Sequence, residues 1–158
     1  MQGLLYALTV LAALGAGIVA GIFFAFSAFV MGALGRLPAV NGIAAMQSIN
    51  VVVLNPVFFT AFFGTAAAAL ILAIAALVRW SEPGALYLLA GALLYLIGTI
   101  FVTMAFNVPL NNKLATVKPA SAEGAGVWKH YLSSWTTWNT LRTAASLAAA
   151  AAFILALP

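Results

Sequence analysis

The chain has 158 residues, of which 66% are hydrophobic and only 5% are charged. Soluble domains carry about 25% charged residues, so this composition excludes a water-soluble fold and predicts an integral, multi-pass membrane protein. The formal net charge of +4 is dispersed over loops and helix ends, so nucleic acid is not an expected partner and membrane lipids are.

Few residues suited to acid–base or metal chemistry are present. The sequence has no cysteine, one histidine (His130) and two acids (Glu82 and Glu123). A carboxylate pair or a histidine–carboxylate metal cluster is therefore nearly excluded within one subunit. We expect no metal and no cofactor, with a haem bound through His130 left open.

Long apolar runs without alternation predict membrane helices. A spanning helix needs about 20 apolar residues, and lipid requires every backbone polar group to be satisfied internally. We therefore expect an all-α fold, an integral membrane four-helix bundle forming a single domain over 1–158. The helices are predicted over 4–34, 42–79, 84–107 and 127–157.

The helix over 4–34 begins with an apolar run too long for a signal peptide. Small residues recur along it every four positions, which lets another helix approach closely. This ridge consists of Ala13, Gly17, Gly21 and Ala25. A homo-oligomer is left open.

In the helix over 42–79, Pro56 removes a backbone hydrogen bond and is expected to cause a kink. Gln47, Asn50 and Asn55 share one helical face just before it. Three amides on one face indicate either the polar lining of a pocket or hydrogen bonds between helices that fix packing. Both interpretations stay open.

The helix over 84–107 ends in Asn107-x-Pro109-x-Asn111. Pro109 is expected to end or kink the helix, which would free backbone carbonyls beside the two amides. We predict that Asn107 and Asn111 form a second wall of the same pocket, and that the nearby Thr99 and Thr103 are structural.

The helix over 127–157 carries Trp128, Tyr131, Trp135, Trp138 and Arg142 at spacings of three and four, so these residues share one face. Asn139 lies beside that face. This face is the predicted third wall of the pocket.

Arg142 lies about 20 Å along the helix from Trp128 at a rise of 1.5 Å per residue, too deep to reach water easily. No acid in the sequence is obviously placed to neutralise it. An arginine held by neutral acceptors keeps a positive field, which suits an anionic or electron-rich ligand. The alternative is a structural arginine that caps carbonyls freed by Pro56 or Pro109.

Lysine and arginine placement predicts the topology. Arg36, Lys113, Lys118 and Lys129 fall on one side of the bundle and Arg79 on the other. The first and third connections are therefore expected to be cytoplasmic, with both termini outside.

Nearly the whole chain resembles the anthrone oxygenase family, a group of small four-helix membrane proteins. The matching segments are Phe26 to Arg36 with Pro38, Met46-Gln47-x-Ile49-Asn50-x-x-x-x-Asn55-Pro56, Asn107-x-Pro109-x-Asn111 and Trp128-x-x-Tyr131-x-x-x-Trp135-x-x-Trp138-Asn139-x-x-Arg142-Thr143. Where the family often has Asn-His-x-x-Arg, this chain has Thr140 in place of the histidine.

The resemblance implies a cofactor-free oxygenase that oxidises an anthrone-like polycyclic phenol to a quinone. The catalytic residues would be Arg142 and Asn139, with Tyr131 or His130 moving the proton. The substrate-binding residues would be Gln47, Asn50, Asn55, Asn107, Asn111, Trp135 and Trp138. The alternatives are a carrier for a quinone, lipid or haem, and a structural membrane subunit. The expected partner is a hydrophobic aromatic small molecule, a lipid or a quinone.

Overall fold

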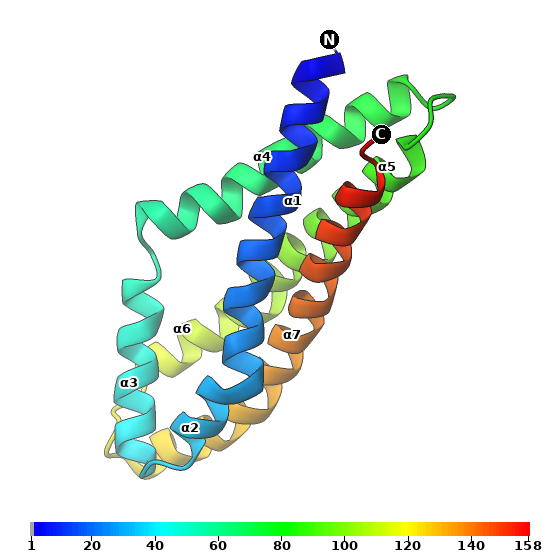
Figure 1. Cartoon of the computed structure of the whole chain (residues 1–158). Coiled ribbons are helices and arrows are strands. Elements are labelled where there is room, and N and C mark those ends of the chain that lie inside the picture. The colour runs from blue at the N-terminus through cyan, green and yellow to red at the C-terminus, as the bar shows by residue number, and fades with distance from the viewer. Residues whose placement is uncertain (1) are drawn as a thin grey trace.

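The computed structural model describes residues 2–158, which are almost entirely helical. Ten helical segments, in which η marks a π-helical turn, form four columns (Figure 1). The first column contains α1 (Gln2–Ala25), η1 (Phe26–Val30) and α2 (Met31–Gly35), and the second contains α3 (Ala39–Val52) and α4 (Pro56–Val78). The third contains α5 (Ala85–Leu93), η2 (Leu94–Phe101), η3 (Thr103–Asn107) and α6 (Val108–Thr116), and the fourth is α7 (Ala122–Leu155).

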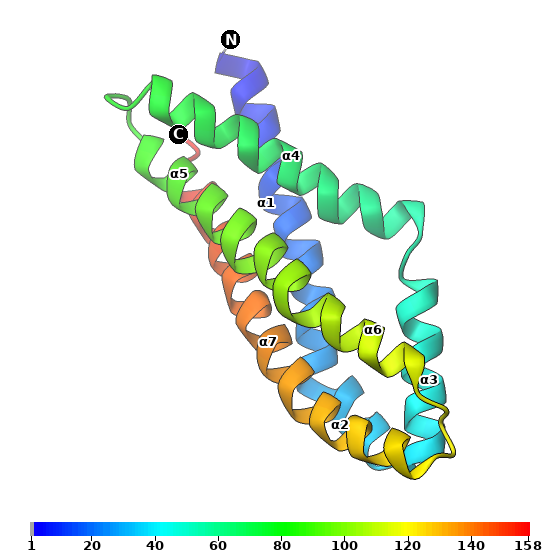
Figure 2. The same cartoon turned by 180° about the vertical axis from the view of Figure 1, so that it is seen from behind.

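The columns form an elongated bundle in which α1 and α7 run side by side (Figures 1 and 2). Helix α4 crosses α1 obliquely and diverges from α6 toward the corner where it meets α3 (Figure 2). Both termini and the α4–α5 turn lie at one end, and the α2–α3 and α6–α7 connections lie at the other. The predicted all-α membrane bundle is confirmed.

Three helical stretches are long and apolar enough to cross a membrane: Gly3–Gly35, Pro56–Val78 and Ala85–Thr116. Large apolar side chains such as Ile18, Ile74 and Leu77 are exposed on the outside of the bundle. In a bilayer such a surface faces lipid tails, so its exposure carries no cost. The 34-residue α7 is longer than any of these spans, but its polar face lowers its hydropathy.

The segment predicted as one kinked helix over 42–79 is two separate helices. Asn55 takes an extended conformation, because the residue before a proline is disfavoured in the helical region. Its side-chain oxygen accepts from the Phe58 backbone N–H at 3.0 Å, and its Nδ2 donates to the Val52 carbonyl at 2.9 Å. One side chain therefore caps both the end of α3 and the start of α4, which turns the expected kink into a break.

The prediction that the third helix ends near 107 is wrong, because this column continues through Pro109 to Thr116. A proline inside a helix lacks an N–H and clashes with the preceding turn. Here the π-helical turn η3, Thr103–Asn107, directly precedes α6, in which Pro109 is the second residue. The wider π turn accommodates the ring, so the column passes the proline without ending.

The fourth helix begins at Ala122, five residues before the predicted start at 127, and ends at Leu155. Ser121 caps its first turn, since the Ser121 hydroxyl accepts from the Gly124 backbone N–H at 2.9 Å. Glu123 adds a negative charge to the same turn, where the helix dipole favours it. Because of these two residues, the helix begins within the segment that we predicted to connect the third and fourth helices.

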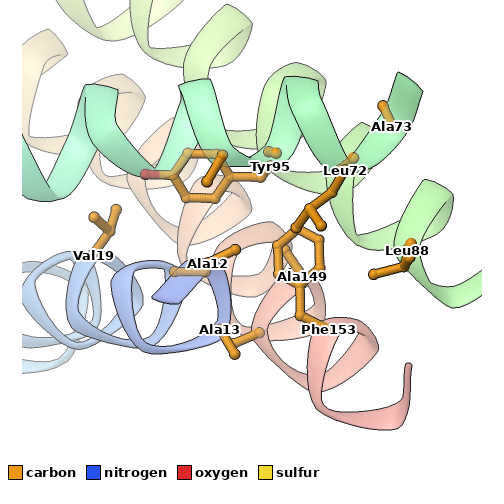
Figure 3. Packing of buried hydrophobic residues seen from close by; sticks show 14 of the residues in the cluster. Ala12, Ala13, Val19, Leu72, Ala73, Leu88, Tyr95, Ala149 and Phe153 are labelled. Atoms are coloured by element: carbon orange, nitrogen blue, oxygen red, sulfur yellow. The ribbon is translucent and has the colours of Figure 1, made fainter. Parts of the chain in front are cut away.

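The core at the terminal end of the bundle is apolar and closely packed. Small residues such as Ala12, Ala13 and Ala149 let the helices approach, while Leu72 and Phe153 fill the space between them (Figure 3). A Cβ on Gly98 would collide with the Ala145 side chain, so η2 and α7 touch where the glycine lies.

The small-residue ridge predicted on the first helix packs closely at Ala13, which is buried in the core, but not at its two glycines. Instead, Gly15 faces Thr65 of α4, and a Cβ added to Gly15 would overlap the threonine hydroxyl. Gly17 and Gly21 have no side-chain neighbour within 4 Å of an added Cβ. They line a shallow groove of about 240 Å³ between α1 and α7.

Candidate functional site

Arg142 lies in the middle of α7 and is 5% exposed, deep in the bundle. Its Nε and Nη2 donate to Asn139 Oδ1 at 3.2 and 2.9 Å, and its Nη1 donates to Thr103 Oγ1 at 3.1 Å. A guanidinium has five N–H donors, so these three bonds leave two donors without a partner among the described residues. We call Arg142, Asn139 and Thr103 the arginine centre.

The arginine centre is bounded by aromatic rings rather than carboxylates. The Arg142 Cζ atom lies 3.9 Å from the Phe23 ring centroid and 5.1 Å from that of Trp135. These contacts stabilise the cation without neutralising it. Of the two acids, Glu82 pairs with Arg79 at the opposite end of the bundle and Glu123 lies in the first turn of α7. The positive charge therefore has only neutral neighbours.

Asn139 fixes the centre to the first column. Its Nδ2 donates to the Phe23 carbonyl and to Ser27 Oγ, both at 2.6 Å, while its Oδ1 receives Arg142. Phe23 lies just before η1 and Ser27 lies within it, where the regular helical hydrogen-bond pattern changes. The end of α1 and the π-helical turn η1 thus each supply one acceptor that orients the amide, and the amide orients the guanidinium.

Asn107 and Trp135 each present a buried polar atom with no partner. Asn107 Nδ2 donates to the Trp135 carbonyl at 3.2 Å, which holds η3 against α7. Asn107 Oδ1 and Trp135 Nε1 find no hydrogen-bond partner within residues 2–158, although their side chains are 1% and 4% exposed. Buried polar groups are nearly always paired, so this acceptor and this donor, with the Trp135 ring 5.1 Å from Arg142, are suited to a ligand.

Tyr131 of α7 is hydrogen-bonded to the second column and the third column. Its hydroxyl donates to Asn111 Oδ1 at 2.8 Å and lies 3.4 Å from the Nδ2 of Asn50, which donates weakly to it. Tyr131 also stacks on Trp135, with ring centroids 5.8 Å apart. The structure therefore brings Asn50, Asn111, Tyr131 and Trp135 together next to the arginine centre.

A family model described as anthrone oxygenase matches residues 58–152. The chain belongs to the anthrone oxygenase family. The matched segment holds Asn107, Asn111, Trp135, Asn139 and Arg142. No curated protein and no solved structure is significantly similar to the chain.

Four residues that we predicted for the site of this family member lie away from the arginine centre. Gln47 donates to the Leu114 and Val117 carbonyls at 2.9 and 3.0 Å, so it ties α3 to the end of α6. Asn55 caps α4. The exposed His130 contacts Ser134, with Nδ1 and Oγ 3.3 Å apart.

Trp138 is the fourth of these residues. Its ring stacks on Phe106 with centroids 3.8 Å apart and planes 9° apart, so Phe106 already covers one face of the indole. A substrate ring cannot use that face while the stack persists. Trp138 packs η3 against α7 instead of opening toward Arg142.

Phe23 and Ser27 were not predicted for the site, although Ser27 lies within the Phe26 to Arg36 segment that resembles the family. Thr103 belongs to the threonine stripe that we predicted to be structural, yet its hydroxyl accepts from Arg142. Thr140, which replaces the histidine often found in this family, places its Oγ1 2.9 Å from Ser27 Oγ. It therefore adds to the contact between α7 and η1.

A cavity of about 560 Å³ lies at the terminal end of the bundle, far from the arginine centre. Its walls come from the start of α1, the end of α4, the start of α5 and the end of α7. None of the residues predicted for the site lines it.

Proposed function

We propose that this protein is an oxygenase that converts an anthrone-like polycyclic phenol to a quinone at the arginine centre. The observation that carries this proposal is a buried, uncompensated cation 5.1 Å from the ring of Trp135, whose Nε1 donor is unpartnered, together with the unpartnered Oδ1 of Asn107, which is bonded to the Trp135 carbonyl. Membership of the anthrone oxygenase family supports the same substrate class.

The reaction needs no group beyond substrate and dioxygen. Loss of one proton from the methylene carbon opposite the ketone gives an electron-rich enolate. The enolate carbon transfers an electron to dioxygen, and the two radicals combine to form a carbon–oxygen bond and, after protonation, a hydroperoxide. Loss of water breaks the oxygen–oxygen bond and leaves the second carbonyl, so each quinone consumes one dioxygen and releases one water.

Arg142 would stabilise the negative charge that develops during these reaction steps. The two free guanidinium N–H groups hydrogen-bond the enolate oxygen and then the peroxide, in a site where low polarity strengthens the interaction. Asn139 is the positioning residue, because its Oδ1 holds two nitrogens of the guanidinium. Tyr131, bonded to Asn111, is the group placed to exchange the proton.

The substrate is a flat, hydrophobic aromatic molecule that dissolves in the bilayer, and no metal or other cofactor takes part. We place the α2–α3 and α6–α7 connections in the cytoplasm, because they and the adjoining turns of α6 and α7 carry Arg36, Lys113, Lys118 and Lys129. The arginine centre then lies within the membrane.

The test is turnover by purified protein in lipid nanodiscs, with quinone formation and dioxygen uptake measured together. We expect a rate above that of empty nanodiscs and one dioxygen consumed per quinone. Replacing Arg142 with Gln should lower kcat by about 10²–10³-fold, the usual loss when an oxyanion donor is removed. The matched control is Arg79→Gln, which changes an arginine at the opposite end.

Equal rates for the wild type and Arg142→Gln, with both proteins folded by thermal melt, would exclude this role for Arg142. A wild type that binds quinone but turns over no anthrone would identify a carrier instead of an enzyme.

A further inference from the structure

Three oxidisable side chains form a continuous stack along one face of α7. The rings of Trp128 and Tyr131 have centroids 5.7 Å apart and planes 16° apart. Tyr131 and Trp135 follow with 5.8 Å and 18°. We call these three residues the aromatic ladder. All three are buried, at 4%, 1% and 4% exposure.

The composition of the ladder differs from that of the other aromatic contacts in residues 2–158. Every other ring pair contains at least one phenylalanine, as in Phe58–Phe62 and Phe106–Trp138. Phenylalanine packs as well as tyrosine or tryptophan but gives up an electron far less readily. Packing alone therefore does not account for three oxidisable rings in succession.

The two ends of the ladder lie in different surroundings. The inner end, Trp135, is 5.1 Å from the Arg142 guanidinium. The outer end, Trp128, lies near the start of α7, and its ring contacts Gly42 so closely that a Cβ there would lie 2.8 Å from it. Exposed polar groups, Lys129 and His130, follow directly in the chain. The ladder thus joins the arginine centre to the end of the bundle that carries the polar connections.

Tyr131, the middle residue of the ladder, makes a hydrogen bond through which its phenolic proton can leave when the ring is oxidised. A tyrosine that loses an electron also loses its phenolic proton, so it needs an acceptor for that proton. The Tyr131 hydroxyl donates to Asn111 Oδ1 at 2.8 Å, and both Asn111 and Asn50 are only partly buried. The amides therefore give the proton a polar route from the ring.

We propose that the aromatic ladder is a one-electron relay that carries oxidising equivalents away from the arginine centre to the membrane face. It rests on the proposed function, because dioxygen chemistry at Arg142 supplies the oxidant. When superoxide escapes before recombination, the substrate radical binds another dioxygen to give a peroxyl radical, which takes one electron from Trp135 and becomes the substrate peroxide anion.

The relay then restores each ring in turn. Tyr131 gives an electron to Trp135, and its proton passes by way of the hydrogen bond to the partly exposed Asn111 to water. Trp128 reduces Tyr131, which regains the proton, and a water-soluble one-electron reductant of the ascorbate class reduces Trp128. In the balance, one electron passes from the reductant to the radical, and no side chain is consumed.

The first test needs no substrate, so it is independent of the proposed oxygenase activity. The chain has four tyrosines, and Tyr6 and Tyr87 are half exposed at the opposite end. In a Tyr6→Phe, Tyr87→Phe background, a flash-generated ruthenium(III) polypyridyl oxidises protein in nanodiscs. Electron paramagnetic resonance should then detect a tyrosyl radical.

We expect Tyr131→Phe to lose most of this signal and Trp128→Phe to lower its yield. The matched control is Tyr95→Phe, because Tyr95 is equally buried but bonds to the Phe62 carbonyl and stacks in no ladder. A signal that persists in Tyr131→Phe, or falls equally in Tyr95→Phe, overturns the relay. Phenylalanine keeps an aromatic ring at each substituted position, and thermal melts check that the variants fold.

The second test measures protection during turnover. Trp128→Phe should start at the wild-type rate but inactivate after fewer turnovers, with oxidised Trp135 found by peptide mass spectrometry. Trp80→Phe, which alters an exposed tryptophan at the opposite end, should behave as wild type. Equal lifetimes for Trp128→Phe and wild type contradict the relay. Absence of any wild-type turnover contradicts only the proposed oxygenase, and the radical experiment then decides the relay alone.

Discussion

The two halves of this bundle are built from the same four columns but differ in the kinds of side chain packed between the helices. At the terminal end, alanines, leucines and Phe153 pack α1, α4, α5 and α7 together, with few polar side chains between them. At the other end, tryptophans, amides and Arg142 lie where α7 packs against η1, α3, η3 and α6. Apolar side chains hold the helices together in the first half, while hydrogen bonds such as those of Gln47 and Asn107 join the helices in the second.

The two halves also differ in whether their buried polar atoms have hydrogen-bond partners. In the apolar half, Tyr95 donates to the Phe62 carbonyl at 3.0 Å, and Thr99 and Ser146 bond each other at 2.7 Å. In the polar half, Asn107 Oδ1, Trp135 Nε1 and two Arg142 donors have no partner among residues 2–158. The polar atoms named in the apolar half are therefore paired, while several buried polar atoms of the polar half are free to bond the ligand that we propose.

The largest effect on stability is expected in the apolar half. Phe153 is fully buried and contacts the helix that carries Gly91. Replacing Phe153 with Ala leaves a cavity and should lower the free energy of unfolding by about 3–5 kcal/mol. Chemical denaturation in mixed micelles measures this loss. A loss no greater than that of Asn139→Ala would show that the apolar half does not dominate stability.

The next effect belongs to the polar half. Asn139→Ala removes the acceptor shared by two Arg142 nitrogens and the two donations to the first column. Hydrogen bonds in a membrane bundle average about 0.6 kcal/mol each, so the loss of these four bonds should lower the free energy of unfolding by about 2–3 kcal/mol. Turnover should fall as well, because the guanidinium loses its orientation. Normal turnover at reduced stability would separate Asn139 from the catalytic geometry.

The smallest effect is expected for the hydrogen bond in the apolar half. Thr99→Val keeps the shape of the side chain but breaks its bond to Ser146. Hydrogen bonds between membrane helices average about 0.6 kcal/mol, so the melting temperature should change only slightly. A loss as large as that of Asn139→Ala would remove the distinction between the two halves.

Much of this arrangement could be predicted from the sequence because helical spacing is local information. Spacings of three and four place Trp128, Tyr131, Trp135 and Arg142 on one face, and all four are buried. The same geometry explains why His130, which lies two residues from Trp128 and one from Tyr131, turns outward.

The remaining features depend on contacts between distant segments. The two-sided cap by Asn55 that separates α3 from α4 needs both helix ends in place. The π-helical turns η1 and η3 arise where the columns pack, and no residue type marks them. Phe23 and Ser27 become part of the site only because Asn139, more than a hundred residues later, reaches them.

The central claim is that Arg142 stabilises an anionic aromatic ligand, and the spectrum of a bound anthrone without oxygen tests it most directly. An ionised anthrone absorbs at longer wavelength than the neutral ketone. At a pH where free anthrone is neutral, wild-type protein in anaerobic nanodiscs should bind it as the anion. Arg142→Gln should bind only the neutral form, with Arg79→Gln matching the wild type. The anion spectrum in Arg142→Gln, or a neutral ligand in the wild type, would contradict the claim.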